Sequence, residues 1–269
     1  MSDVVLMGIV NVTPDSFSDG GRWLDPEAAI AHGLELVAEG AGILDVGGES
    51  TRPGAAPVAA DEEARRVVPV IAGLVAAGTH AQLSVDTTKA TVAAAALDAG
   101  ATYVNDVTAL RGDPALAGLV ADRGADCCLM HMQGEPRTMQ REPRYDDVVD
   151  DVRAFLEARV AFAVGEGIAE ARISVDPGIG FGKTLAHNLE LLARLDALVA
   201  LGFPVVVGTS RKSFLGAITG REDPAARVPA TIAANVLAYT RGARVFRVHD
   251  VAPARDALLV AAATLRPHG

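Results

Sequence analysis

Two carboxylates and one amide in the chain have the chemistry to recognise a flat nitrogen heterocycle. Asp86, Asn105 and Asp176 each follow a short apolar run. Carboxylate oxygens accept hydrogen bonds from neighbouring N–H donors and an amide serves an adjacent ring nitrogen, so the three suit the edge of an amino-pyrimidinone. Because unpaired buried acceptors are costly, such a site would select its ligand strongly. Ion pairing of the same residues with nearby lysines at a barrel mouth is the alternative interpretation.

Cationic side chains occupy similar positions along the chain. The sequence has 24 Lys and Arg against 34 Asp and Glu, a net charge of −10, and only three of the cations are lysines. The cations and the histidine that come just after apolar runs are Lys89, Lys183, Arg211, Lys212, Arg247 and His249. We therefore expect an acidic outer surface around a locally cationic site, which suits an anionic substrate.

A polar side chain stands at or near the end of every apolar run. In chain order these residues are Asn11, Asp45 with Glu49, Asp86, Asn105, His131, Asp176, Ser210 with Lys212, and Arg247 with His249. A single Asp or Asn after a strand is often only a turn former or a helix N-cap. Eight such positions in step indicate one common site.

The apolar runs have the length and composition of buried strands. They cover residues 4–10, 43–46, 82–85, 102–104, 127–130, 173–175, 204–207 and 244–248. Amphipathic segments of helical spacing follow them at residues 26–39, 61–77, 89–99, 114–123, 146–164, 185–201, 225–239 and 252–265. Asp25-Pro26 and Asp113-Pro114 each place a capping residue before a proline, which predicts helix starts there.

Eight strand–helix units in 269 residues predict an α/β fold, a (β/α)8 TIM barrel in which residues 1–269 form a single domain. An open doubly wound sheet is the structural alternative. No internal repeat, linker or low-complexity block divides the chain. The carboxyl ends of all barrel strands meet at one face, so the polar residues would converge there. The long connections at 13–25, 47–60 and 133–145 are expected to serve as lids or binding loops.

The composition restricts the possible classes of function. Half of the residues are hydrophobic and 22% are charged, as in ordinary globular proteins. The acidic balance disfavours nucleic acid and anionic membranes as partners. We find no secretory leader and no apolar run of membrane-spanning length. Cys127 and Cys128 are interpreted as buried strand residues rather than a disulfide framework, so we expect a cytoplasmic protein.

Several familiar motifs are incomplete in this sequence. Residues 176–184 (DPGIGFGKT) nearly form a phosphate-binding P-loop, but Pro177 stands where the first glycine is required. The dinucleotide-binding glycine pattern fails as well, because Lys183 or Leu185 occupies its third glycine position. No zinc-protease, nucleophile-elbow or clustered metal-ligand pattern is found. What remains is a glycine-rich loop whose backbone can approach a flat or anionic ligand closely.

Eight segments of the chain, taken together, resemble the dihydropteroate synthase family. They are 11–21 (NVTPDSFSDGG), 45–54 (DVGGESTRPG), 84–87 (SVDT), 105–106 (ND), 129–132 (LMHM), 176–183 (DPGIGFGK), 210–213 (SRKS) and 247–250 (RVHD). The resemblance implies a transferase of folate biosynthesis, a sulfonamide target, built on a pterin-binding barrel. Such enzymes condense 6-hydroxymethyl-7,8-dihydropterin diphosphate with 4-aminobenzoate to give 7,8-dihydropteroate and diphosphate.

The same resemblance implies roles for individual residues. The implied pterin-binding residues are Asp86, Asn105, Met130, Asp176, Phe181, Lys212 and Arg247. The implied diphosphate contacts are Asn11, Arg247 and His249, and Asn11 would also be a ligand of the Mg²⁺ cofactor. The implied 4-aminobenzoate site consists of Phe17, Thr51, Arg52, Pro53 and Ser210. The implied catalytic residues are Asp19, Lys212, Arg247 and His249, and a homodimer is expected because the family is generally homodimeric.

The groups present favour an SN1-like path without a protein nucleophile. Diphosphate would leave the pterin methylene carbon, the electron-rich ring would delocalise the cation, and Asp19 would stabilise it before the aromatic amine attacks. No activated Cys or Ser with a paired base is visible in the sequence.

Three other functions are weighed against this one. A pterin-binding methyltransferase module would share the acceptor site but has less use for segments 14–21, 50–53 and 210–212. A non-catalytic paralogue usually lacks parts of the catalytic loops, which are all present here. A Schiff-base aldolase would use Lys183 or Lys212.

Several other polar residues are interpreted as structural, and one has no assigned role. His131 is either a hydrogen-bonded core residue or part of the site. The pairs Glu62-Glu63 and Asp146-Asp147 are expected to be solvated helix starts. Lys89 has no assigned role.

Overall fold

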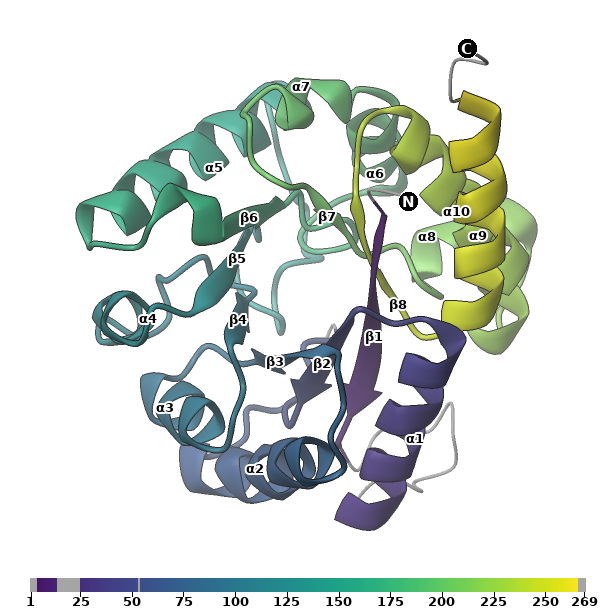
Figure 1. Ribbon diagram of the computed structural model, residues 1–269. Helices are drawn as coiled ribbons and strands as arrows, with labels where there is room; N and C mark the ends of the chain where they lie inside the picture. The colour runs from purple at the N-terminus through teal and green to yellow at the C-terminus, as the bar shows by residue number, and fades with distance from the viewer. Residues whose placement is uncertain (1–3, 14–24, 53, 266–269) are drawn as a thin grey trace.

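Eight parallel strands form the centre of the computed structural model, which describes residues 4–13, 25–52 and 54–265 (Figure 1). The strands are β1 (Val5–Asn11), β2 (Ile43–Gly47), β3 (Gln82–Asp86), β4 (Tyr103–Asp106), β5 (Asp126–Met130), β6 (Ile173–Asp176), β7 (Val206–Val207) and β8 (Val245–Val248). They pair in the order β6-β5-β4-β3-β2-β1-β8-β7, and a parallel bridge from Val175 to Val205 joins β6 to β7. The ring is thereby closed, and the predicted (β/α)8 barrel is confirmed.

Successive residues of each strand point to opposite sides of the barrel wall. The interior is filled by a buried cluster that lies mostly near the strand starts: Met7, Ile43, Tyr103, Cys128, Val206 and Val245. The residues that alternate with them, such as Leu6 and Leu44, belong to the larger core beneath the helices. Cys127 and Cys128 fall on opposite sides by the same alternation and are buried free thiols, as predicted. The filled amino-terminal half leaves the carboxyl ends of the strands for a site.

The helices surround the ring of strands (Figure 1). They are α1 (Pro26–Glu39), α2 (Ala60–Ala76), α3 (Ala90–Asp98), α4 (Leu116–Arg123), α5 (Val148–Gly165), α6 (Leu185–Ala193), α7 (Asp196–Val199), α8 (Ser213–Thr219), α9 (Val228–Thr240) and α10 (Val251–Leu265), with 3-10 turns at Glu170–Arg172 and Ala225–Arg227. The start of α1 is as predicted, because the Asp25 carboxylate accepts a hydrogen bond from the Glu27 N–H at 3.0 Å. Asp147 caps α5 in the same way, through the N–H groups of Val149 and Asp150.

The predicted helix start at Asp113-Pro114 is wrong by two residues, since α4 begins at Leu116. The Asp113 carboxylate accepts hydrogen bonds from the starts of two different segments. Its Oδ1 accepts a hydrogen bond from Ala115 N at 3.0 Å, and its Oδ2 accepts one from Ala90 N at 2.9 Å, the first residue of α3. The side chain therefore satisfies the exposed start of the preceding helix rather than only its own.

The segment after β6 also differs from the prediction of one helix at 185–201. The backbone leaves helical geometry at Arg194 (φ −111°, ψ 30°), which separates α6 from α7. Neither glycine nor proline marks this break in the sequence, and the Arg194 guanidinium pairs with Asp147 at the start of α5. The short helix α8 was not predicted either, because no helical segment was expected between the apolar run at 204–207 and the helix at 225–239.

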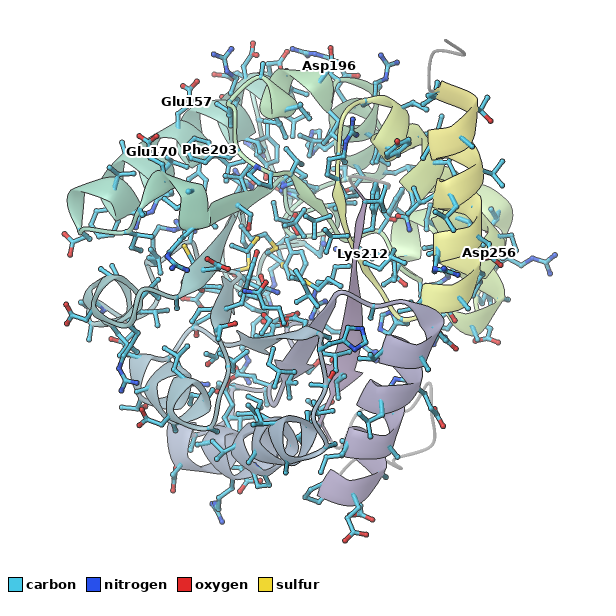
Figure 2. All side chains as sticks on the ribbon, in the orientation of Figure 1. Glu157, Glu170, Asp196, Phe203, Lys212 and Asp256 are labelled. Atoms are coloured by element: carbon cyan, nitrogen blue, oxygen red, sulfur yellow. The ribbon has the colours of Figure 1, made fainter. Side chains whose placement is uncertain are left out.

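Several acidic side chains lie on the outside of the molecule. Figure 2 shows Glu157, Glu170, Asp196 and Asp256 at the periphery and Lys212 within the ring of strands. This distribution agrees with the expectation that the net charge describes the outer surface. Among the helices that the structure describes, none combines the length and apolar character needed to cross a membrane.

Candidate active site

The strand register brings predicted polar residues to one level of the barrel. Asn11 of β1 is opposite Gly47 of β2, Gly47 is opposite Asp86 of β3, and Asp86 is opposite Asn105 of β4. Asp176 is the last residue of β6. All of these lie at the carboxyl ends of their strands, the face at which barrel enzymes carry their sites.

Asp45 of β2 connects several of these groups. Its carboxylate accepts hydrogen bonds from Ser84 Oγ at 2.6 Å, from Asn105 Nδ2 at 2.9 Å and from Arg247 Nε at 2.6 Å. Arg247 Nη2 also donates to Asp86 Oδ2 at 2.8 Å. The sequence placed Asp45 at a strand end but gave it no role. Full burial inside the barrel makes it the residue that orients both the amide and the guanidinium.

The charges in this cluster are tightly linked. Burial raises the pKa of Asp86 to about 7, although the neighbouring Arg247 lowers it. The two carboxylates beside Arg247 raise the pKa of its guanidinium, against the opposing effect of burial. Asp86 therefore changes charge near neutral pH while its cationic partner stays charged.

A second acceptor group lies at the end of β6. Asp176 Oδ1 accepts a hydrogen bond from Gly178 N at 2.6 Å. Lys212 Nζ donates to Ile179 O and lies 4.7 Å from the centroid of the Phe181 ring. Burial raises the pKa of Asp176, with Lys212 opposing, and burial lowers the pKa of Lys212 to about 8, with Asp176 opposing. The two groups form a partly desolvated acceptor and donor pair beside an aromatic ring.

The glycine-rich loop after β6 is seated on the end of β5. Gly178 and Gly180 have φ values of 67° and 84°, and a Cβ on Gly178 would lie 1.8 Å from His131 O. Only glycine permits this close approach. Lys183 then turns inward, where its Nζ lies 2.9 Å from His131 Nδ1 and donates to Phe181 O at 3.0 Å.

His131 is a buried, hydrogen-bonded core residue, the first of the two interpretations that the sequence allowed. Its ring also packs edge-on against Phe155, with 4.8 Å between the ring centroids. Burial lowers the pKa of His131 to about 3, and burial lowers the pKa of Lys183 to about 7. The imidazole is therefore neutral at pH 7, and its contact with the lysine supports the loop that carries Phe181.

Ser210 and His249 meet across the ends of β7 and β8. Ser210 Oγ accepts a hydrogen bond from His249 N at 3.1 Å and lies 3.0 Å from His249 Nδ1. Burial and the nearby arginines lower the pKa of His249 well below its ordinary value, so its ring is neutral at pH 7. Arg211 forms a two-point ion pair with Asp250, at 2.7 and 3.0 Å.

The remaining predicted residues divide into three groups. Met130 is buried with Val107, Met132 and Met139, and Phe181 packs against this cluster, so the two lie in one apolar group, and their contact with a pterin stays a prediction. Asn11 and Thr51 are half-buried at the rim, and Arg52 is exposed. Phe17, Asp19 and Pro53 lie outside the described residues.

Ion pairs among the described residues bear on two expectations about charge. Arg247 binds Asp45 and Asp86, and Lys89 binds Glu49 and Glu63, so these two cations of the expected cationic site are paired with carboxylates in the free protein. Glu63 is not a solvated residue of a helix start but is fully buried. The Glu63 side chain points inward from the first turn of α2, where it reaches Lys89.

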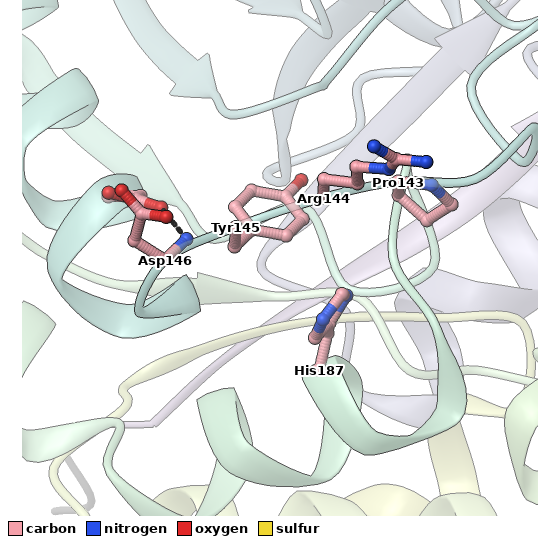
Figure 3. Close-up of a pocket in the computed structure, with 6 residues that line it drawn as sticks. Pro143, Arg144, Tyr145, Asp146 and His187 are labelled. Atoms are coloured by element: carbon pink, nitrogen blue, oxygen red, sulfur yellow. Dashed lines mark hydrogen bonds between the residues drawn. The ribbon is translucent and has the colours of Figure 1, made fainter.

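Cavities occur both at the site and away from it. A cavity of about 130 Å³ lies between Asp86 and Thr51, and Glu49, Glu63 and Met132 also line it. A second, more open pocket lies between the loop before α5 and the start of α6, lined by Pro143, Arg144, Tyr145, Asp146, Asp151 and His187 (Figure 3). The first joins the predicted pterin side to the predicted aminobenzoate side, and the second touches none of the predicted site residues.

The donor set is compatible with a magnesium ion held mainly by substrate. Within the described residues no group of three or more His, Cys, Asp or Glu side chains could hold a metal ion. Mg²⁺ prefers oxygen ligands and is commonly bound by one or two protein groups together with water and phosphate oxygens. The half-buried Asn11 at the end of β1 supplies one such oxygen at the level of Asp86.

The barrel and its polar cluster define a class of protein: a barrel enzyme that binds a polar heterocycle at the carboxyl ends of its strands. A family profile described as pterin binding enzyme matches residues 7–249. The chain belongs to this family.

The chain is similar to several dihydropteroate synthases, including proteins of solved structure, over nearly its full length. The dihydropteroate synthase of Neisseria meningitidis serogroup C is 48% identical over 256 residues, which cover 94% of this chain and 90% of the relative. A Xanthomonas albilineans dihydropteroate synthase structure with 4-aminobenzoic acid has a TM-score of 0.91 and 53% identity, covering 98% of this chain and 94% of that one. A structure of the enzyme from the same organism in complex with 7,8-dihydropteroate has a TM-score of 0.88 and 49% identity, with coverages of 99% and 97%.

Proposed function

We propose that the chain condenses 6-hydroxymethyl-7,8-dihydropterin diphosphate with 4-aminobenzoate, giving 7,8-dihydropteroate and diphosphate. The observation that carries this proposal is the grouping of Asp86, Asn105 and Asp176 at one face of the barrel, beside Lys212 and Arg247. The relatives named dihydropteroate synthase, and the related structure that holds 7,8-dihydropteroate, support the same reaction.

The pterin edge is assigned to the acceptors inside the barrel. Because Asn105 Nδ2 already donates to Asp45, its Oδ1 and a second N–H remain for the ligand. Arg247 occupies Asp86 Oδ2 in the free protein, at 2.8 Å. A pterin that donates to the same carboxylate competes with the guanidinium, which then turns to the ring face and to the diphosphate. Met130 and Phe181 supply the apolar walls.

The departing diphosphate is assigned to Asn11, Arg247 and His249. Negative charge grows on its oxygens as the bond to the methylene carbon breaks, and fixed donors in a partly desolvated site stabilise that charge. When bound, Mg²⁺ adds positive charge at these oxygens, with Asn11 as its protein ligand. The neutral His249 donates a hydrogen bond rather than a full charge, since its pKa lies well below 6.5.

The aromatic amine then attacks the methylene carbon. Thr51, Arg52 and Ser210, with Phe17 and Pro53, are assigned to the 4-aminobenzoate site, and Asp19 is assigned to electrostatic stabilisation of the cation. No protein nucleophile is required. Both cysteines are buried strand residues, and burial raises the pKa of Cys127 to about 12, so its thiol stays protonated.

A diphosphate-release assay with Mg²⁺ and both substrates tests the proposal. We expect turnover by the wild type and large losses in Lys212→Ala and Asp176→Asn. Unchanged turnover in both variants would overturn the site assignment. Mass spectrometry during turnover should find no pterin adduct on the protein, and borohydride with a carbonyl substrate should trap no lysine adduct.

We also propose a cytoplasmic homodimer. Exposed leucine and isoleucine side chains lie on three helices that pack on one another: Leu185 and Leu189 of α6, Ile218 of α8 and Leu237 of α9. Apolar groups gathered in this way favour covering by a second copy of the chain. Sedimentation of the wild type should give a dimer, and Ile218→Glu should shift it toward monomer. The buried, unpaired Cys127 and Cys128 are compatible with a reducing cytoplasm.

A further inference from the structure

Lys89 joins parts of three neighbouring elements. It is the N-cap residue of α3, and its Nζ donates hydrogen bonds to Glu49 Oε2 and to Glu63 Oε2. Glu49 is the second residue after β2, and Glu63 lies in the first turn of α2. One ammonium group therefore connects the beginning of the β2–α2 loop to the beginnings of two helices.

Glu63 anchors this arrangement in the interior. Its side chain is 1% exposed, and its Oε1 has no hydrogen-bond partner among the residues that the structure describes. Burial raises the pKa of Glu63 and the hydrogen bond from Lys89 opposes that rise. Burial alone would lower the pKa of Lys89, but the two glutamates raise it above its ordinary value. The buried carboxylate and the ammonium therefore depend on each other for their charge.

Glu49 belongs to the beginning of the β2–α2 loop, and we call its first two residues, Gly48 and Glu49, the root of this loop. Gly48 precedes Glu49 and packs so closely on α2 that an added Cβ would lie 3.0 Å from Glu63 O. Arg66 Nη1, also from α2, donates to Gly48 O at 2.9 Å and holds the same backbone. The loop thus leaves β2 in a direction fixed by side chains of α2 and α3.

This root lies between the two assigned halves of the site. Glu49, Thr51, Glu63 and Asp86 line the cavity of about 130 Å³. Thr51 is two residues beyond Glu49, so a change in the direction of the loop at Glu49 moves Thr51 and Arg52 directly. Asp86, in contrast, is held by the strand register of β3 and by Arg247.

We propose that Lys89 is a positioning residue for the 4-aminobenzoate site: its ammonium, held by Glu49 and the buried Glu63, fixes the root of the loop that carries Thr51 and Arg52. The inference rests on the proposed function for the identity of that substrate. Lys89 touches no assigned pterin residue, so its loss acts on one substrate and leaves the other.

The decisive variant removes the ammonium without leaving a buried charge. In Lys89→Met alone, Glu63 loses its partner, and we expect a lower Tm. In Lys89→Met with Glu63→Gln, the buried charge is gone and Tm returns toward the wild-type value, but Glu49 is still released. We expect the KM for 4-aminobenzoate to rise about tenfold in the double variant, as misplacement of a binding group by a fraction of an ångström commonly costs. Measured at about pH 8.5, where Asp86 is ionised with or without the charge of Glu63, the KM for the pterin diphosphate should stay within about twofold of the wild-type value.

Two further measurements separate positioning from general damage. Glu49→Met removes only the loop-side acceptor and leaves the pair of Lys89 with Glu63, so the KM for 4-aminobenzoate should rise with Tm unchanged. The backbone amides of residues 48–52 and 54–59, apart from Pro57, should exchange hydrogen faster in both the double variant and Glu49→Met. Arg153→Met is the matched control, because it removes an exposed ion pair with Glu157 on α5 and should change neither readout.

The outcomes distinguish the two proposals. If the wild type releases no diphosphate from the two substrates, the proposed function fails, while the hydrogen exchange still reports on the loop root. If exchange of these loop amides is unchanged in both variants, or if both KM values rise together, Lys89 is not a positioning residue for this loop.

Discussion

The two halves of the site are built from different kinds of structure. The assigned pterin half consists of Asp86, Asn105 and Asp176 at strand ends, whose positions follow from the register of the barrel. The assigned aminobenzoate half comes largely from connections, and the described part of the β2–α2 loop is held at its root by Lys89 and Arg66. Strand ends give the fixed geometry that hydrogen-bond selection needs, and loops allow a second substrate to enter and a product to leave.

The largest expected effect is on the rigid half. Asp176→Asn keeps the size of the side chain, but it removes the negative charge near the Lys212 ammonium and replaces one acceptor oxygen by an NH2 donor that cannot accept from the pterin. We expect kcat/KM for the pterin diphosphate to fall about a thousandfold, with the KM for 4-aminobenzoate nearly unchanged. Steady-state diphosphate release with each substrate varied in turn measures both values. A loss below about tenfold would contradict the assignment of Asp176.

The second expected effect concerns how the rigid half is supported. Asp45→Asn weakens the hold on the Arg247 guanidinium and on the Asn105 amide, and we expect kcat/KM to fall about a hundredfold. The matched control is Ser84→Ala, which removes only the one hydrogen bond that the Ser84 hydroxyl donates to Asp45. Its loss should be several times smaller. Equal losses in the two variants would mean that Asp45 serves only the packing of the barrel.

The third prediction uses pH to separate the halves. The pKa of Asp86 is about 7 in the free protein, so the group is protonated and loses an acceptor site as the pH falls below that value. Binding of a pterin without the diphosphate, measured by calorimetry, should weaken about tenfold between pH 8 and pH 6. Binding that does not change over this range would contradict the role of Asp86 as a carboxylate acceptor.

The same pKa also has a consequence for stability. An ordinary value near 3.8 is raised to about 7 in the folded state, so Asp86 lowers the free energy of unfolding progressively as the pH rises from about 4 to 7. Asp86→Asn should lack this part of the pH dependence, which urea titrations at several pH values measure.

The smallest expected effect is in the loop half. Thr51→Val replaces the hydroxyl by a methyl group in a side chain of nearly equal volume. We expect the KM for 4-aminobenzoate to rise about fivefold, which corresponds to the loss of one hydrogen bond. The KM for the pterin diphosphate should not change. If that second KM also rises, the two halves are coupled more closely than their construction indicates.

Much of the fold could be predicted because the barrel repeats one local pattern. Each buried strand is a short apolar run, and its end is marked by a polar residue such as Asp86 or Asp176. The break at Arg194 and the helix α8 could not be predicted, because no glycine or proline marks the first and the second is shorter than a helical pattern requires. Asp113 shows the limit of capping rules, since its carboxylate also serves a helix 23 residues earlier.

The site was predicted in its residue types more fully than in its contacts. The positions of Asp86, Asn105, Asp176 and Arg247 follow from strand ends, and the structure brings them to one face. Which carboxylate binds which cation depends on side-chain distances across the ring, so the pairing of Arg247 with Asp45 could not be predicted. The inward turn of Glu63 could not be predicted either, because it depends on the position of α2 against α3. The roles assigned to Phe17, Asp19 and Pro53 stay predictions.

The barrel has a seam. β7 has only two residues, and its link to β6 is the single bridge from Val175 to Val205. Asp176 ends one side of this seam and Lys212 follows the other, so a pterin bound to both acts as a staple across it. When the barrel opens locally, β6 and β7 should separate before the other strands. A bound ligand should therefore slow amide hydrogen exchange in β6 and β7 more than in the long β1–β2 pairing. A substrate that binds both residues would therefore add a second connection between β6 and β7 in a ring that the bridge already closes.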